Sequence, residues 1–125
     1  MRVIHTAMWV SDLEATRAFY EDVLGLDFHR EFTTDGVTNY YVGSDDGAEL
    51  QFKHRADESD PVTPDGVDHV AVGVDDVDAT FERVVEETGC PVVLEPTTIE
   101  AANSRAAFVE DPDGYTVEFV AGLDA

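Results

Sequence analysis

The feature that most constrains the fold of this sequence is an internal repeat. HTAMWVSDLEAT, at residues 5–16, aligns without gaps to HVAVGVDDVDAT, at residues 69–80, with a histidine at the start of each copy. The offset is about half of the 125-residue chain, so the repeat indicates one duplicated module rather than a solenoid of many short units. A chain of this length is also the usual size of a single compact domain.

Each copy carries the same order of secondary-structure signals. A strand with alternating apolar residues is followed by an aspartate-rich helix N-cap and by a helix whose apolar residues recur at helical spacing and which ends at a glycine. Turn signals such as SDDG and EDPDG then separate three further strands. The expected elements are strands at 3–10, 26–33, 37–43 and 48–54 with a helix at 12–24, and strands at 67–74, 91–95, 105–110 and 115–121 with a helix at 76–88.

These signals predict an α+β fold of two tandem βαβββ modules. Module 1 spans residues 1–55, an acidic linker spans 56–66, and module 2 spans 67–121. We expect the two modules to form a single domain over residues 1–125, since that length is typical of one domain.

One histidine and one glutamate interrupt the strand pattern of each module. His5 and His69 occupy equivalent positions in the repeat, and Glu49 and Glu118 lie in the last strands, in AELQF and YTVEFVA. A carboxylate in an otherwise apolar strand is costly to bury unless it is paired or coordinated. Two imidazoles and two carboxylates without a thiolate suit a divalent first-row metal ion. Duplication about a pseudo-twofold axis could bring all four to one point.

The remaining histidines and the cysteine give no such signal. His29 and His54 lie outside the repeat symmetry, and we expect both to be surface residues. Cys90 is the only cysteine, so it cannot form an internal disulfide, and its neighbours are not basic. We interpret it as structural.

The charge of the chain limits its partners. A formal net charge of −21, from 28 acidic and 7 basic residues, disfavours binding to nucleic acids and to anionic membranes. The acidic residues are scattered, as on the solvated surfaces of proteins from salt-accumulating halophiles. No segment has the roughly 20 apolar residues that a membrane span needs, and the N-terminus has no signal-peptide pattern, so we expect a cytoplasmic protein.

Three segments resemble a known family. MRVIHTAMWVSDLEATRAFYEDVLGL, HVAVGVDD and AFVEDPDGYTVEF are similar to glyoxalase I (lactoylglutathione lyase), a family of the vicinal oxygen chelate, or glyoxalase/bleomycin resistance/dioxygenase, superfamily. The resemblance covers nearly the whole chain. It implies that His5, Glu49, His69 and Glu118 bind a divalent metal, with Ni²⁺ or Co²⁺ favoured and Zn²⁺ or Mn²⁺ possible.

The resemblance also implies a reaction and an assembly. The substrate would be the hemithioacetal of methylglyoxal, a 2-oxoaldehyde, and a low-molecular-weight thiol, and the product an S-D-lactoyl thioester. Glu118 would act as the base, with Glu49 as the opposite carboxylate. A homodimer is expected, in which His5 and Glu49 of one subunit share a site with the partner's His69 and the partner's Glu118.

Two positions depart from the family pattern and concern the thiol. Trp9 stands where the family usually has an arginine that binds the carboxylates of the thiol, and it could either line the pocket or pack in the core. Arg105 is the one basic residue left before AFVEDPDGY, and it is a candidate for the substrate pocket. The thiol is therefore open between glutathione and another such as γ-glutamylcysteine. Alternative functions are another enzyme of the superfamily, an epimerase or a dioxygenase, and a small-molecule-binding or resistance protein.

Overall fold

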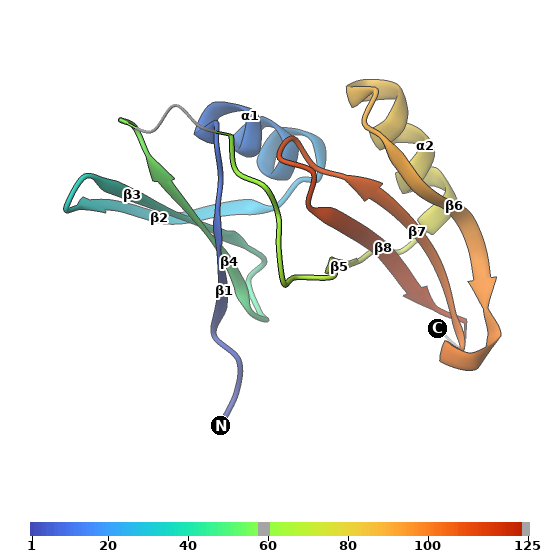
Figure 1. The fold of residues 1–125 in the computed structure, drawn as a ribbon. Helices are drawn as coiled ribbons and strands as arrows, with labels where there is room; N and C mark the ends of the chain where they lie inside the picture. Colours follow the sequence, from blue (N-terminus) through green and yellow to red (C-terminus); the bar gives the residue numbers. More distant parts are fainter. Residues whose placement is uncertain (58–60, 124–125) are drawn as a thin grey trace. The chain divides into compact units, whose positions relative to one another are not determined.

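The computed structural model describes residues 1–57 and 61–123, and its chain divides into two compact units, Met1–Thr63 and Pro64–Ala125. Each unit contains one four-stranded mixed sheet and helical segments (Figure 1). No helix in the described part of the chain is long and apolar enough to cross a membrane.

The first unit is a βαβββ module. Its sheet has the order β1-β4-β3-β2, in which β1 runs parallel to β4 and the other neighbours are antiparallel. Its elements in chain order are β1 (His5–Trp9), α1 (Leu13–Arg17), the π-helical segment η1 (Ala18–Val23), β2 (Asp27–Thr34), β3 (Val37–Gly43) and β4 (Glu49–Arg55).

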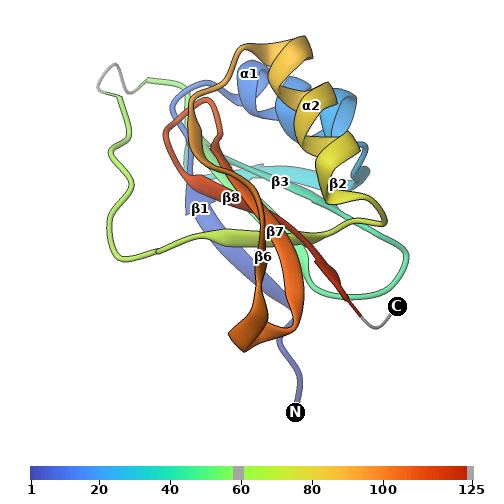
Figure 2. The ribbon, with the colours of Figure 1, turned by 90° about the vertical axis from the view of Figure 1, so that its right-hand side faces the viewer.

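The second unit repeats this arrangement. Its sheet has the order β5-β8-β7-β6, with β5 parallel to β8, and α2 packs across β6, β7 and β8 (Figure 2). Its elements are β5 (Val70–Gly73), α2 (Val77–Thr88), β6 (Val92–Ile99), the 3₁₀ turn η2 (Glu100–Ala102), β7 (Ser104–Glu110) and β8 (Thr116–Gly122). The predicted α+β fold of two βαβββ modules is therefore confirmed.

Three elements differ clearly from the sequence-based expectation. The strand expected at 67–74 is confined to Val70–Gly73, so His69 lies just before it. The helix expected at 12–24 is a short α-helix continued by a π-helix, in which the amide of Leu24 bonds to the carbonyl of Phe19, five residues earlier. The strand expected at 91–95 continues to Ile99. The register of β6 against β7 shifts between Leu94 and Thr97, so Pro96 lies at an irregularity where its missing N–H disrupts no regular ladder.

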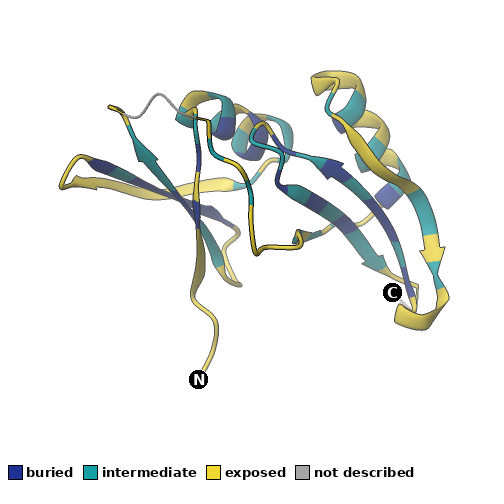
Figure 3. Cartoon of the chain, viewed as in Figure 1, coloured by how far each residue is buried: buried dark blue, intermediate teal, exposed yellow. Residues whose placement is uncertain are grey.

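In each module, buried side chains of the sheet face the helix, and Figure 3 shows how burial varies along the strands. In the first module Tyr20 of η1 and Phe52 of β4 are fully buried, with ring centroids 4.8 Å apart. In the second, Val84 of α2 is fully buried, as is Phe119 of β8. Since successive strand residues point to opposite faces, the residues between these core positions are free to build a site on the other face.

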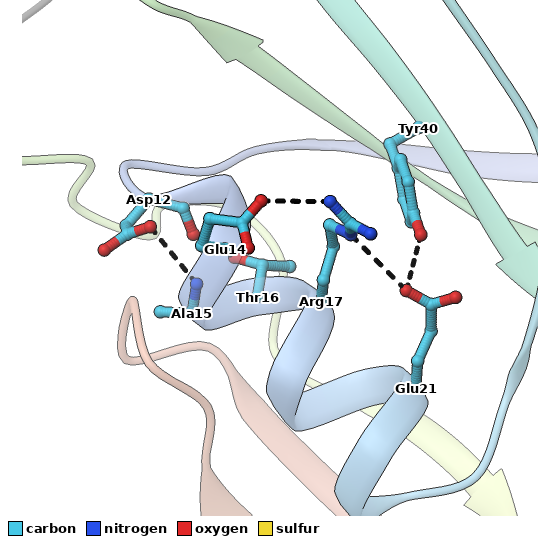
Figure 4. Close-up of polar contacts among 7 residues, drawn as sticks. All are labelled: Asp12, Glu14, Ala15, Thr16, Arg17, Glu21 and Tyr40. Carbon is cyan, nitrogen blue, oxygen red and sulfur yellow. Dashed lines mark hydrogen bonds and ion pairs between the residues drawn. The ribbon is translucent and has the colours of Figure 1, made fainter.

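Polar contacts fix the helical segment of the first module (Figure 4). Asp12 accepts a hydrogen bond from the amide of Ala15 at 3.1 Å, which is the N-cap expected from the sequence. The hydroxyl of Tyr40 on β3 donates to Glu21 of η1 at 2.5 Å, and Arg17 forms an ion pair with the same carboxylate at 3.7 Å. Burial, together with the contact to Glu21, raises the pKa of Tyr40 to about 12.

Candidate metal centre

In the first module, His5 and Glu49 lie side by side. They are partners in the parallel β1–β4 ladder, so both side chains project from the same face of the sheet. Met8 and Phe52 also pair with each other, three residues further along each strand, and they are buried on the opposite, helix-covered face. The His5–Glu49 pair therefore lies on the face that the helix does not cover.

Two consecutive residues of β2 hold the Glu49 carboxylate. Nδ1 of His29 lies 2.6 Å from Oε2, and Nη2 of Arg30 lies 3.4 Å from Oε1. The hydrogen bond from His29 lowers the pKa of Glu49 below its ordinary value, against the opposing effect of desolvation, and the positive charge of Arg30 adds to the lowering. His29 is exposed, as expected, but it is not outside the candidate site.

A β-bulge explains why both residues reach Glu49. Phe28 pairs with Val42 and Arg30 pairs with Tyr41, so β2 contains one more residue than β3 at this point. The guanidinium of Arg30 lies 3.9 Å from the centroid of the Tyr41 ring, on the Glu49 face. The extra residue allows the consecutive residues His29 and Arg30 to share this face, which strict alternation would forbid.

The second module presents a similar pair. His69 directly precedes β5, and its Nε2 lies 3.2 Å from Oε1 of Glu118 on the adjacent β8. Its Nδ1 lies 2.7 Å from Oδ2 of the exposed Asp68, and its ring meets Phe108 edge-on at 5.4 Å. A carboxylate at the second ring nitrogen fixes the tautomer and orientation of a metal-binding imidazole.

Each module by itself thus supplies one imidazole nitrogen and one carboxylate group. Within residues 1–57 and 61–123, no three His, Cys, Asp or Glu side chains are grouped closely enough to hold a metal ion. The donor types suit Ni²⁺, Co²⁺, Zn²⁺ or Mn²⁺. The structure therefore describes the four predicted ligands as two separate pairs, His5 with Glu49 and His69 with Glu118. That the two pairs converge on one metal ion remains a prediction.

Trp9 shares the face of His5 and is 42% exposed, so core packing does not account for it. It pairs with Lys53 across the β1–β4 ladder, and the Lys53 ammonium lies 5.3 Å from the centroid of the indole ring. The Arg55 guanidinium lies 5.4 Å from the same ring. Trp9 therefore contacts two cations on the same sheet face as His5 and Glu49, four residues further along β1.

Arg105 is placed differently. The β7–β8 register pairs Arg105 with Ala121 and Phe108 with Glu118, so Arg105 and Glu118 lie on opposite faces of the sheet. The guanidinium binds Asp78 of α2 through two hydrogen bonds of 2.9 and 2.7 Å. The structure does not bring Arg105 to the His69–Glu118 pair.

The chain is a duplicated-module protein: it has two βαβββ modules, and each carries an imidazole–carboxylate pair on its open face, the sheet face that the helix does not cover. The model of the Glyoxalase/Bleomycin resistance protein/Dioxygenase superfamily matches residues 2–119. The chain belongs to this superfamily.

Relatives narrow this assignment. The chain is 37% identical to the lactoylglutathione lyase of Haemophilus influenzae, over 96% of this chain and 92% of that protein. It is 35% identical to the lactoylglutathione lyase of Neisseria meningitidis, over 96% and 90%. These matches confirm the resemblance to glyoxalase I.

Solved structures agree on the fold. The trypanothione-dependent glyoxalase I of Leishmania major aligns with a TM-score of 0.82 and 26% identity, over 99% of this chain and 88% of that chain. Glyoxalase I from Zea mays aligns with a TM-score of 0.83 and 24% identity, over 95% of this chain but only 44% of the maize chain. The present chain thus spans less than half of the length of the maize protein.

Proposed function

We propose that this chain is a metal-dependent glyoxalase I-like isomerase, which converts the hemithioacetal of methylglyoxal and a low-molecular-weight thiol into an S-D-lactoyl thioester. The observation that carries the proposal is the imidazole–carboxylate pair on the open face of each module, His5 with Glu49 and His69 with Glu118. The lactoylglutathione lyases among the relatives support the same activity.

The same four side chains are the proposed metal ligands. Two nitrogen and two oxygen donors without a thiolate fit a divalent first-row ion, with Ni²⁺ or Co²⁺ favoured and Zn²⁺ or Mn²⁺ as alternatives. When bound, such an ion supplies Lewis-acid polarisation of the substrate oxygens. We place the complete sites at the interface of a cytoplasmic homodimer. Apolar side chains exposed on β2 and β6 support an assembly: Phe28, Phe32, Val92, Val93 and Leu94.

Glu118 is the proposed base. It removes the hydrogen from the carbon that bears the hydroxyl and the sulfur and returns it to the adjacent carbonyl carbon, while the hydroxyl hydrogen moves to the adjacent oxygen. No atom is gained or lost, so the reaction is an isomerisation. The different surroundings of the two carboxylates support this choice, because Glu49 is held by His29 and Arg30, whereas Glu118 pairs with His69.

The thiol is proposed to carry carboxylates, as glutathione and γ-glutamylcysteine both do. The open face of the first sheet carries three of the seven basic residues of a chain whose net charge is −21: Arg30, Lys53 and Arg55. Lys53 contacts the Asn39 side-chain oxygen at 3.4 Å and the Trp9 ring, and neither contact neutralises its charge. Lys53 therefore provides the cation that the family usually has at the position of Trp9.

A metal-reconstitution assay tests the proposal. The purified protein, stripped of metal and kept in molar KCl, receives Ni²⁺, Co²⁺, Zn²⁺ or Mn²⁺ together with methylglyoxal and either glutathione or γ-glutamylcysteine. The expected result is metal-dependent formation of the thioester. Tight metal binding without turnover for any metal and thiol would contradict the proposal and favour an epimerase, a dioxygenase or a binding protein of the same superfamily.

A further inference from the structure

We infer that His29 is a positioning residue of the metal centre, whose Nδ1–H holds the Glu49 carboxylate in the orientation that the metal requires. The inference rests on the proposed function, since it assumes that Glu49 is a ligand. His29 would act through Glu49 and not as a ligand itself.

The contacts at Glu49 support this role. Nδ1 of His29 is 2.6 Å from one carboxylate oxygen and Nη2 of Arg30 is 3.4 Å from the other. An ionised carboxylate can only accept, so the His29 nitrogen donates. Two partners on two different oxygens restrict rotation of the carboxylate group. Its two oxygens offer about four lone-pair sites, so a metal can still bind.

The fold leaves room above β3 for the contact between His29 and Glu49; we call this the path across β3. In the order β1-β4-β3-β2, His29 on β2 must reach across β3 to Glu49 on β4. The residue of β3 beneath the imidazole is Gly43, and a Cβ atom built there would lie only 3.1 Å from Cε1 of His29. His29 lies two residues after Asp27, the partner of Gly43, so ordinary alternation puts it on this face, and the bulge adds Arg30 to the same face. The glycine leaves room for the imidazole ring.

The second module has no equivalent of this path. The residue of β7 that pairs with Glu118 is Phe108, whose ring occupies the face that Gly43 leaves open in the first module. The two modules therefore present unlike carboxylates: Glu49 is contacted by two residues of β2, and Glu118 is contacted by the histidine of its own module. Hydrogen bonds that hold a metal ligand in place change metal affinity by about 10- to 100-fold in other metalloproteins.

Metal affinity measured without turnover tests the inference. Metal-free wild-type protein and variants are titrated with Ni²⁺ in competition with a chromophoric chelator, after thermal unfolding has shown that each variant is folded. His29→Ala is expected to weaken Ni²⁺ binding by about tenfold or more. His29→Asn, whose amide nitrogen replaces Nδ1, is expected to retain most of the affinity. His54→Asn is the matched control, since His54 contacts a backbone oxygen at 3.3 Å, and it should bind as the wild type does.

A second variant tests the path across β3. Gly43→Ala is expected to weaken Ni²⁺ binding in the wild-type protein but to have little further effect in His29→Ala, because both changes remove one contact. If His29→Ala binds Ni²⁺ as tightly as the wild type, the inference about His29 is overturned and the proposed function is not. The amide of His29→Gln lies at the position of Nε2. If His29→Gln retains the Ni²⁺ affinity and His29→Asn loses it, then His29 is a direct ligand, and this result also overturns the inference. A wild-type protein that binds no divalent ion overturns both the proposed function and this inference.

Discussion

Nε2 of His69 lies 3.2 Å from Oε1 of Glu118. Glu49, at the corresponding place in the first module, instead forms a hydrogen bond with His29 and an ion pair with Arg30. A general base must approach the carbon from which it takes the proton. The contrast therefore predicts unequal roles for the two glutamates.

Replacing each glutamate by glutamine tests this difference. Glu118→Gln is expected to lower kcat by at least about 100-fold, because a positioned general base contributes about 10²- to 10⁴-fold to the rate. Glu49→Gln is expected to weaken metal binding and to recover much of its kcat at saturating metal. Both constants come from thioester formation measured over a range of Ni²⁺ concentrations. Equal losses of kcat at saturating metal would contradict the assignment of Glu118 as the base.

Removing the charge of Lys53 tests the recognition of the thiol. Lys53→Gln is expected to raise KM for the glutathione hemithioacetal about tenfold with little change in kcat, since a charge-assisted hydrogen bond contributes about 1.5–3 kcal/mol. The hemithioacetal of the uncharged thiol 2-mercaptoethanol should show no such increase. Arg83→Gln removes the same charge from the exposed surface of α2 and is the control. An equal effect on both substrates would mean that Lys53 does not bind the carboxylates.

Local patterns predicted most of the fold. The repeat, the alternation around His5 and His69, and the N-cap aspartates all act within a few residues, so they are readable from the sequence. The π-helical turn after Arg17 was missed because apolar residues such as Phe19 and Tyr20 fit an α-helix equally well.

The missed parts of the site depend on strand register. The consecutive residues His29 and Arg30 lie on the Glu49 face together only because of the bulge in β2, and neither glycine nor proline marks that bulge in the sequence. The one sequence signal is Gly43, on the neighbouring strand. Arg105 is a pocket candidate in the sequence because it is the one basic residue left before AFVEDPDGY. Its spacing from Glu118 does not reveal whether the two share a face, and a one-residue change of register reverses the answer.

The contact between Arg105 and Asp78 predicts a role in stability. Its two hydrogen bonds join β7 to α2, and they lower the pKa of Asp78 and raise that of Arg105. Arg105→Ala is expected to lower the unfolding temperature and to leave KM for the thiol substrate unchanged. Asp78→Ala should lower it by a similar amount, and the double variant should lose little more than either single one. A raised KM with an unchanged unfolding temperature would return Arg105 to the substrate site.

The last prediction concerns the buried hydroxyl of Tyr40, which donates to Glu21. Burial raises its pKa from 10.0 to about 12 in the folded protein, so the unfolded chain ionises first as the pH rises. The stability that the neutral hydroxyl contributes is complete below about pH 10 and is lost progressively between pH 10 and 12. Tyr40→Phe should be less stable than the wild type at pH 8 by about 1 kcal/mol, and this difference should shrink and then reverse as the pH rises through that interval. Urea unfolding at each pH measures this. Tyr41→Phe, which leaves the Glu21 contact in place, should keep the wild-type dependence, and parallel curves for the wild type and Tyr40→Phe would contradict the assignment.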